Sequence, residues 1–174
     1  GIGATTAVLA AKQGYAVCVN YRCDKAAAEK VVTSIQSLGG KAIALKADVS
    51  SEPEVIQLFE KVADNLGTIT ALVNNAGILE KQSRVEDITA GRLHRIFSIN
   101  VTGSFLCARE AIKRMSTKHG GTGGAIVNIS SGAACSGSPN EYVDYAASKG
   151  AIDTMTIGLA KEVADEGIRV NAVR

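Results

Sequence analysis

A tyrosine and a lysine stand four residues apart in the segment YAASK, at Tyr145 and Lys149. Residues at this spacing share one face of a helix, so the two side chains would be neighbours there. The positive charge of the lysine would stabilise the phenolate form of the tyrosine, and the phenol could then donate or accept a proton near neutral pH. Most pairs with this spacing are only solvated neighbours on a helix surface, so the spacing alone leaves both interpretations open.

Two serines, Ser130 and Ser131, end an apolar run shortly before this segment. The run predicts a buried strand. Ser131 at its end could donate a hydrogen bond to a substrate oxygen on which negative charge develops. Ser130 would then point to the opposite side.

Two other segments have residues suited to binding a dinucleotide. Gly1-Ile2-Gly3 stands at the start of a helical pattern, where backbone N–H groups and the positive helix end could approach a pyrophosphate, although simple turn chemistry is the alternative. About twenty residues on, an NAD-binding domain places an acidic residue for the ribose hydroxyls, but this chain has Asn20-Tyr21-Arg22. Arg22 could pair with a 2′-phosphate, which favours NADP. A solvated strand-end charge is the alternative, and Asp24 could still favour NAD.

Polar residues also follow two more of the expected strands. Asp48-Val49 places a carboxylate where it could accept from an adenine amino group, although an aspartate before Ser50 is as often a capping residue. In Asn74-Asn75-Ala76-Gly77, paired amides after a buried strand could lock the sheet edge, while Ala76 and Gly77 keep the backbone low under a ribose. An ordinary Asn/Gly turn is the alternative.

Helix-length and strand-length patterns alternate along the whole chain and position these residues. The expected helices are 3–13, 25–38, 52–66, about 90–118 and 143–166, and the expected strands are 15–20, 41–49, 69–73, 125–130 and 168–173. Such alternation predicts an α/β fold, a doubly wound parallel sheet with helices on both faces in three α/β/α layers. Ligands of such sheets bind beyond the carboxyl ends of the strands. No repeat or linker suggests a boundary, so residues 1–174 are interpreted as a single domain.

Composition excludes several classes of protein. The chain has 174 residues, 46% hydrophobic and 21% charged, with a net charge of +2 and interleaved signs, which argues against a nucleic-acid surface. No apolar run approaches the roughly 20 residues that span a bilayer, and no signal peptide is evident. The four cysteines form no C-x-x-C pair and only two histidines are present, so we expect no metal site and a cytoplasmic protein with unpaired thiols.

Taken together, these motifs resemble those of the short-chain dehydrogenase/reductase family. The matches run in order along the chain: Gly1-Ile2-Gly3, Asp48, Asn74–Gly77, Asn100 within SINVTG, Ser131, YAASK, and Arg169-Val170-Asn171, which resembles the strand before the family's Pro-Gly turn. The resemblance implies a Rossmann fold and an oxidoreductase that moves hydride between NADP(H), or else NAD(H), and a carbonyl/alcohol pair on a small molecule.

The family's residue roles carry over by position. The resemblance implies that Tyr145 is the acid/base, that Lys149 binds the nicotinamide ribose and tunes Tyr145, that Ser131 orients the substrate oxygen, and that Asn100 anchors a water in the proton relay. A polar residue at a break in a long helix can free a backbone carbonyl for such a water. The implied cofactor-binding residues are Gly1, Ile2, Gly3, Asn20, Tyr21, Arg22, Asp48, Val49, Asn74, Ala76, Gly77, Tyr145 and Lys149.

The chain departs from the family pattern in two ways. The loop from Ser131 to Tyr145 is one residue longer than the commonest spacing, so that simple counting selects Gly132; we assign the role to Ser131 because the strand end fixes its position. The family's first strand and its C-terminal elements have no counterpart. Because that strand lies mid-sheet, we expect a gap in the core and unpaired backbone groups.

Other interpretations remain beside this one. The chain could be a non-catalytic dinucleotide-binding redox sensor, or a fragment that is inactive alone, and the substrate is not predicted because the substrate loop is absent. The helices near 101–115 and 151–164 carry apolar residues on more than one face, and relatives pair through them, so we expect a homodimer or homotetramer. These residues include Phe105, Ile112, Ile152 and Leu159.

Overall fold

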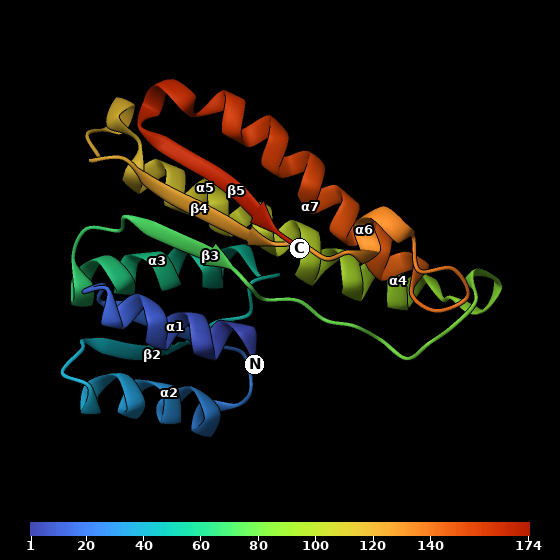
Figure 1. The fold of residues 1–174 in the computed structure, drawn as a ribbon, viewed down its shortest axis with the longest axis horizontal. Helices are drawn as coiled ribbons and strands as arrows, with labels where there is room; N and C mark the ends of the chain where they lie inside the picture. The colour runs from blue at the N-terminus through green and yellow to red at the C-terminus, as the bar shows by residue number, and fades with distance from the viewer. The chain divides into compact units, whose positions relative to one another are not determined.

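All strand pairs of the molecule are parallel, and a helical connection joins each strand to its partner in the sheet. The computed structural model describes residues 1–174, which form two compact units, Gly1–Ile69 and Thr70–Arg174 (Figure 1). Parallel strands linked through helices are the arrangement that the alternating sequence pattern predicted, so the α/β fold class is confirmed. The single domain over residues 1–174 stays a prediction.

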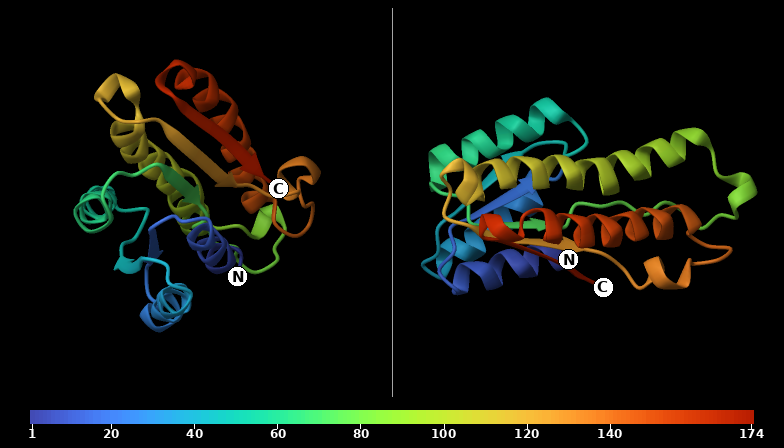
Figure 2. Two further views of the ribbon diagram at one scale, coloured as in Figure 1. Left: turned by 60° about the vertical axis from the view of Figure 1, so that its left-hand side comes forward. Right: turned by 90° about the horizontal axis from the view of Figure 1, so that it is seen from above.

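The first unit is built on a sheet of two strands. Its elements are α1 (Ile2–Lys12), β1 (Val17–Tyr21), α2 (Lys25–Ser37), β2 (Ala42–Lys46) and α3 (Glu52–Leu66). Helices α1 and α2 pack together on one side of the sheet and α3 lies on the other (Figure 2, left). The core of this unit comes from Ile35 of α2 and from Val55, Leu58 and Phe59 of α3.

The second unit is built on the sheet β3-β4-β5. Its elements are β3 (Ala71–Asn74), η1 (Val85–Asp87), α4 (Ala90–Phe97), the π-helix η2 (Ser98–Thr102), α5 (Gly103–Met115), η3 (Thr117–His119), β4 (Gly124–Ile129), α6 (Ala133–Ser136), α7 (Val143–Glu162), η4 (Ala164–Glu166) and β5 (Ile168–Val173). The long helices α5 and α7 run along the sheet (Figure 2, right). The core of this unit includes the buried residues Ile96 of α4, Met115 of α5, Ile126 of β4 and Ile152 of α7.

Burial alternates along the strands of this second sheet. In β5, Ile168 and Val170 are buried, whereas Arg169 and Asn171 are exposed. Because successive side chains of a strand point to opposite faces, α5 and α7 cover one face of the sheet. Within this unit α5 and α7 therefore form one helical layer against the sheet.

Strand β3 differs from its prediction as a buried apolar strand. Ala71 and Val73 are exposed, and only Asn74 is buried. Side chains of a strand point to the two faces of a sheet, and α5 and α7 cover only one face here, so Ala71 and Val73 on the other face are left exposed. Within their own sheets β3 bonds only to β4 and β1 bonds only to β2, and the gap expected in the core stays a prediction.

The single long helix expected over 90–118 is interrupted. A π-helix, η2, separates α4 from α5 and carries the buried Asn100. Such a bulge in a helix is commonly found at functional sites. No helix of the protein combines the length and apolar character that crossing a membrane requires.

The carboxylate of Glu110 in α5 makes the free energy of unfolding depend on pH in the acid range. Its buried carboxylate accepts from Lys113 Nζ and Arg114 Nη1, both at 2.8 Å. Burial would raise the pKa of Glu110, but these hydrogen bonds lower it from 4.5 to about 2. A lowered folded-state pKa means that this stabilisation is fully present above about pH 4.5 and is lost as the pH falls toward 2.

We therefore expect Glu110→Gln to lower the free energy of unfolding by about 2 kcal/mol at pH 7, and by less as the pH falls below 4.5. Urea denaturation at a series of pH values measures the effect. The control is Glu29→Gln, which removes an exposed carboxylate paired with Lys25. Exposed pairs contribute little, so the control should change stability by under about 0.5 kcal/mol. A loss for Glu110→Gln that does not shrink on acidification would contradict the assignment.

Candidate active site

Tyr145 and Lys149 are neighbours on α7, as their spacing predicted. The Lys149 Nζ atom lies 5.7 Å from the centroid of the Tyr145 ring. Lys149 is buried and donates from Nζ to the carbonyl oxygen of Ile129 at 2.6 Å, which ties it to the end of β4. Burial lowers the pKa of Lys149, and the carboxylate of Asp153 opposes that shift. The phenol is only partly covered, so the pair places a half-exposed acid beside a buried cation.

Asn100 connects the π-helix to the segment that follows β3. Its Nδ2 donates to the Ile78 carbonyl at 3.0 Å, and its Oδ1 accepts from the Ile78 N–H at 2.8 Å. A Cβ atom placed on Gly77 would lie 3.4 Å from Asn100 Oδ1 and 3.7 Å from Lys149 Nζ. The backbone of Gly77 therefore passes close to both side chains, and Asn100, Gly77 and Lys149 meet at one place.

The expected break in the helix at Asn100 is present, but its carbonyl is engaged within the protein. The Asn100 carbonyl oxygen accepts from the Ser104 hydroxyl at 2.9 Å. A carbonyl oxygen has two lone pairs, so one of its positions for a water is taken. A water at this carbonyl stays a prediction, and the Ser104 hydroxyl would share the oxygen with it.

Ser148 was missed by the sequence analysis although it lies within YAASK. It is fully buried, its hydroxyl accepts from Asn100 Nδ2 at 3.0 Å, and it donates to the Tyr145 carbonyl at 2.7 Å. This connects the π-helix to the backbone of Tyr145. The signal that could have found it is a hydroxyl residue on the face of a helix that must pack against another helix.

Asn74 locks the sheet edge, as its motif predicted. Its Nδ2 donates to Asn128 Oδ1 at 2.9 Å and to the Ser104 carbonyl at 3.2 Å. Asn128, a second residue that the sequence analysis missed, donates onward to the Thr156 hydroxyl at 2.9 Å. A buried polar line therefore links β3, β4 and α7 beneath the candidate site. The adjacent Asn75 donates its N–H to the Val73 carbonyl at 3.0 Å, which is turn chemistry.

Ser131 lies in the loop after β4 and is partly exposed, whereas Ser130 is buried and donates to the Lys149 carbonyl at 3.4 Å. The Ser131 Oγ accepts from the Ala133 N–H at 3.1 Å, at the start of α6. Ser131 makes no hydrogen bond with Tyr145 or Lys149. Ser131 therefore lies in the loop between β4 and α6, where the Ala133 N–H fixes its Oγ. Its O–H remains free to donate a hydrogen bond.

The predicted residues of the first unit lie at the carboxyl ends of β1 and β2. Arg22 Nη1 and Asp48 Oδ2 lie 3.7 Å apart, and the Arg22 side chain is 56% exposed. The other oxygen of Asp48, Oδ1, accepts from the N–H and hydroxyl of Ser50 at 2.9 and 2.6 Å. The Ser50 hydroxyl bond is the main reason that the pKa of Asp48 lies below its ordinary value. Asp48 therefore stabilises the turn that contains Ser50 through Oδ1, as the capping alternative predicted, and its other oxygen, Oδ2, faces Arg22.

The remaining predicted residues of this unit are placed less specifically. Gly1 is the N-cap of α1, with Ile2 and Gly3 in its first turn, and the space beside Gly1 is open. The Asn20 amide donates to the Leu45 and Ala47 carbonyls at 3.2 and 3.1 Å, which occupies its nitrogen. Tyr21 ends β1 and Val49 is buried.

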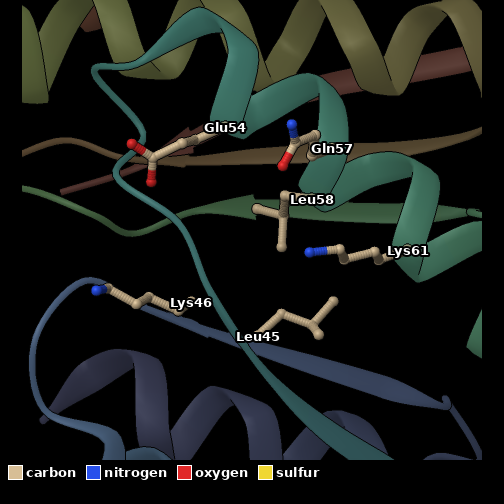
Figure 3. Close-up of a pocket in the computed structure, with 6 residues that line it drawn as sticks. All are labelled: Leu45, Lys46, Glu54, Gln57, Leu58 and Lys61. Carbon is tan, nitrogen blue, oxygen red and sulfur yellow. The ribbon is translucent and has the colours of Figure 1, made fainter.

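A shallow pocket in the first unit lies away from these residues. It opens between β2 and α3 (Figure 3), and its lining is Leu45, Lys46, Glu54, Gln57, Leu58 and Lys61. None of the predicted site residues lines it.

Comparison with known proteins identifies similar sequences along the whole chain. A model described as short chain dehydrogenase matches residues 1–174. The uncharacterized oxidoreductase YgfF of Escherichia coli is 58% identical over 174 residues, which are 100% of this chain and 70% of that protein. The versicolorin reductase stcU of Emericella nidulans is 39% identical over 173 residues, 99% of this chain and 63% of that protein.

Solved structures give the same result. A short chain dehydrogenase from Burkholderia cenocepacia in complex with NADP superposes with a TM-score of 0.92 at 32% identity, over 100% of this chain and 69% of that one. The acetoin dehydrogenase of Enterobacter cloacae superposes with a TM-score of 0.90 at 33% identity, over 99% of this chain and 67% of that one. The chain thus spans about two thirds of these solved proteins.

Proposed function

The chain belongs to the short-chain dehydrogenase family, and from this we propose that it carries the acid/base residues of an NADP(H)-dependent oxidoreductase acting on a carbonyl/alcohol pair. The observation that carries the proposal is the meeting of Tyr145, Lys149, Asn100 and Gly77 beside the end of β4. A redox sensor without turnover has no use for a half-exposed phenol next to a buried cation. The change Tyr145→Phe, which removes only the phenolic oxygen, tests the proposal.

The residues of the second unit fit a nicotinamide riboside. An ammonium has three donors, and Lys149 uses one on the Ile129 carbonyl, so two remain for ribose hydroxyls. Gly77 has no side chain to fill the space beside that ammonium. Asn74 commits its amide nitrogen inside the fold, so we expect its contribution, like that of Ala76, to come through the backbone.

The residues of the first unit fit the adenosine and phosphate groups of NADP(H). The N-terminus of α1 at Gly1-Ile2-Gly3 offers unpaired backbone N–H groups to a pyrophosphate. Arg22 offers an exposed guanidinium to a 2′-phosphate. The two residues before it, Asn20 and Tyr21, are uncharged and would not repel the phosphate. Asp48 and Val49 would contact the adenine. The complex of a relative with NADP supports this choice of cofactor.

The chemistry of the reaction divides between cofactor and protein. When bound, NADPH supplies the hydride that adds to the carbonyl carbon. The Tyr145 hydroxyl donates a proton to the oxygen of that carbonyl, and in the oxidative direction the phenolate accepts it. Lys149 favours the phenolate by its positive charge. Ser131 accepts from the Ala133 N–H, which leaves its own O–H to donate to the substrate oxygen as negative charge develops.

Asn100 and Ser148 position Tyr145 and the segment after Gly77 through hydrogen bonds. Asn100 bonds the segment after Gly77 and the Ser148 hydroxyl, and Ser148 bonds the carbonyl of Tyr145. We assign to Asn100 the anchoring of a water through the remaining lone pair of its carbonyl. The substrate is a small molecule with a carbonyl or alcohol, and relatives named as a versicolorin reductase and an acetoin dehydrogenase do not narrow that class.

We also propose that the full-length protein is a dimer or tetramer through α5 and α7. Phe105 and Ile157 are 51% and 60% exposed on these helices, whereas Ile152 is buried against the sheet. Exposed large apolar side chains on two helices favour burial against a partner. Sedimentation equilibrium is expected to give a dimer or larger species, with Phe105→Asp shifting it toward monomer. A monomeric protein would contradict this assembly.

A further inference from the structure

Arg92 and Asp144 form an ion pair next to the proposed acid/base residue. Arg92 lies in the first turn of α4 and Asp144 in the first turn of α7. Two nitrogens of the guanidinium meet the two carboxylate oxygens: Nε donates to Oδ2 at 2.6 Å, and Nη2 donates to Oδ1 at 3.1 Å. A planar guanidinium that meets a carboxylate at two points fixes direction as well as distance.

This pair is far more buried than the other ion pairs of the second unit that join separate elements. The Asp144 side chain is 1% exposed and that of Arg92 is 11% exposed, against 59% for Arg95 and 27% for Glu80. Burial would raise the pKa of Asp144, but the hydrogen bonds from Arg92 and from the Tyr145 N–H lower it below its ordinary value. Desolvation makes such pairs a weak source of stability, so their geometric role is the one to examine.

The pair reaches the backbone of Tyr145 directly. The first N–H groups of a helix have no partner inside the helix, and the N-cap of α7, Tyr142, offers no side-chain hydrogen bond. Asp144 Oδ1 accepts from the Tyr145 N–H at 2.9 Å and thereby supplies that partner. On the other side, the Tyr145 carbonyl accepts from Ser148. Both polar backbone groups of Tyr145 are thus held by side chains.

Arg92 extends the same network to the loop that follows Gly77. Its Nη1 donates to the Lys81 carbonyl at 2.7 Å, and its own N–H is held by the Thr89 hydroxyl at 3.2 Å. One guanidinium therefore joins α4, the loop after β3 and the start of α7, three segments far apart in the sequence. Each of its three side-chain nitrogens has a defined acceptor.

We propose that Arg92 and Asp144 are positioning residues, whose ion pair sets the first turn of α7 and with it the direction in which Tyr145 presents its phenol. The proposal rests on the proposed function of Tyr145 as the acid/base. Neither residue touches the reacting atoms. A small displacement of an acid/base group can cost up to about a hundredfold in rate, because proton transfer requires hydrogen-bond distance.

The test uses Asp144→Asn and Arg92→Lys in the full-length protein. Asparagine keeps an oxygen for the Tyr145 N–H but removes the charge, and lysine keeps the charge but cannot make the two-point contact. We expect kcat to fall about tenfold for Asp144→Asn and about threefold for Arg92→Lys. The KM values for NADPH and the carbonyl should change less than twofold, and hydrogen exchange at the Tyr145 amide should accelerate.

The control is Glu166→Gln, at the far end of the same unit. Glu166 accepts from the buried Ser116 hydroxyl at 2.5 Å, so the change removes a structural hydrogen-bonded charge without contact to α4 or the first turn of α7. It should leave kcat within twofold of the original. If Asp144→Asn fails to fold, Arg92→Lys decides.

Unchanged kcat in Arg92→Lys, together with an unchanged exchange rate at Tyr145, would overturn the positioning role. Failure of the proposed function is a different result, because Tyr145→Phe would then retain full turnover.

Discussion

Replacement of Tyr145 by phenylalanine in the full-length protein is expected to lower kcat for NADPH-dependent carbonyl reduction about a thousandfold. General acids contribute roughly 10²- to 10⁴-fold, and this change removes the proton donor while keeping the ring. Lys149 stays tied to the Ile129 carbonyl and keeps an aromatic neighbour 5.7 Å away. NADPH affinity should therefore remain within about twofold. Loss of NADPH absorbance reports turnover, and calorimetry reports binding.

Tyr15→Phe provides a matched control for this experiment. Tyr15 loses the same atom, but it precedes β1 in the first unit, is 48% exposed and is not a residue of the proposed site. Its kcat should remain within twofold of the original protein. A Tyr145→Phe variant that keeps more than about a tenth of the original kcat would rule out the phenol as the acid/base, and loss of NADPH binding would assign it a binding role instead.

The alternation of elements was predictable because it depends on local patterns. The amphipathic pattern with Pro53 in its first turn predicted a helix over 52–66, and α3 spans Glu52–Leu66. The strand expected over 168–173 is β5, Ile168–Val173. Boundaries moved where a non-local contact intervened. The helix expected to reach 166 ends at Glu162, and the following turn, η4, positions Glu166 to accept from Ser116, fifty residues away.

The burial of β3 and α1 could not be predicted from local sequence patterns. The apolar sequence of β3 predicts burial on both faces, yet Ala71 and Val73 are exposed. The same run of residues is compatible with a strand covered on one face or on both, because side-chain burial depends on which elements pack against each face of the sheet. Helix α1 shows the same effect: its pattern is apolar, but none of its residues is buried, and Ile2 and Leu9 are 64% and 56% exposed.

The candidate site likewise contains contacts that the sequence predicted and contacts that it did not. Tyr145 and Lys149 could be placed together because four residues of helix separate them. The partners that support them come from remote parts of the chain: Asn100 and Ser148 are 48 residues apart, and Arg92 and Asp144 are 52 residues apart. The sequence pattern therefore identified the groups that could do chemistry, whereas only the fold showed which side chains hold them in place.

Replacement of Arg22 by aspartate is expected to move cofactor preference from NADPH toward NADH by at least about a hundredfold. The change removes a guanidinium that could pair with the 2′-phosphate and adds a repelling carboxylate. It also leaves Asp48, now 3.7 Å from Arg22 Nη1, without its cation. A hydrogen bond to a charged group contributes about 1.5–3 kcal/mol, and each 1.4 kcal/mol is about tenfold in affinity. The ratio of kcat/KM for NADPH and NADH in the full-length protein measures the shift.

Lys25→Asp is the control, because it makes the same change of charge three residues further along. Lys25 is 69% exposed, begins α2 and pairs only with Glu29. A solvent-exposed charge that makes no direct contact with the phosphate is partly screened by salt, so the control should alter the NADPH to NADH ratio by less than about threefold. Equal NADPH affinity before and after Arg22→Asp would refute phosphate pairing. A similar shift in both variants would assign the preference to the overall charge of this edge, whereas a shift confined to Arg22→Asp would support a specific contact with the 2′-phosphate.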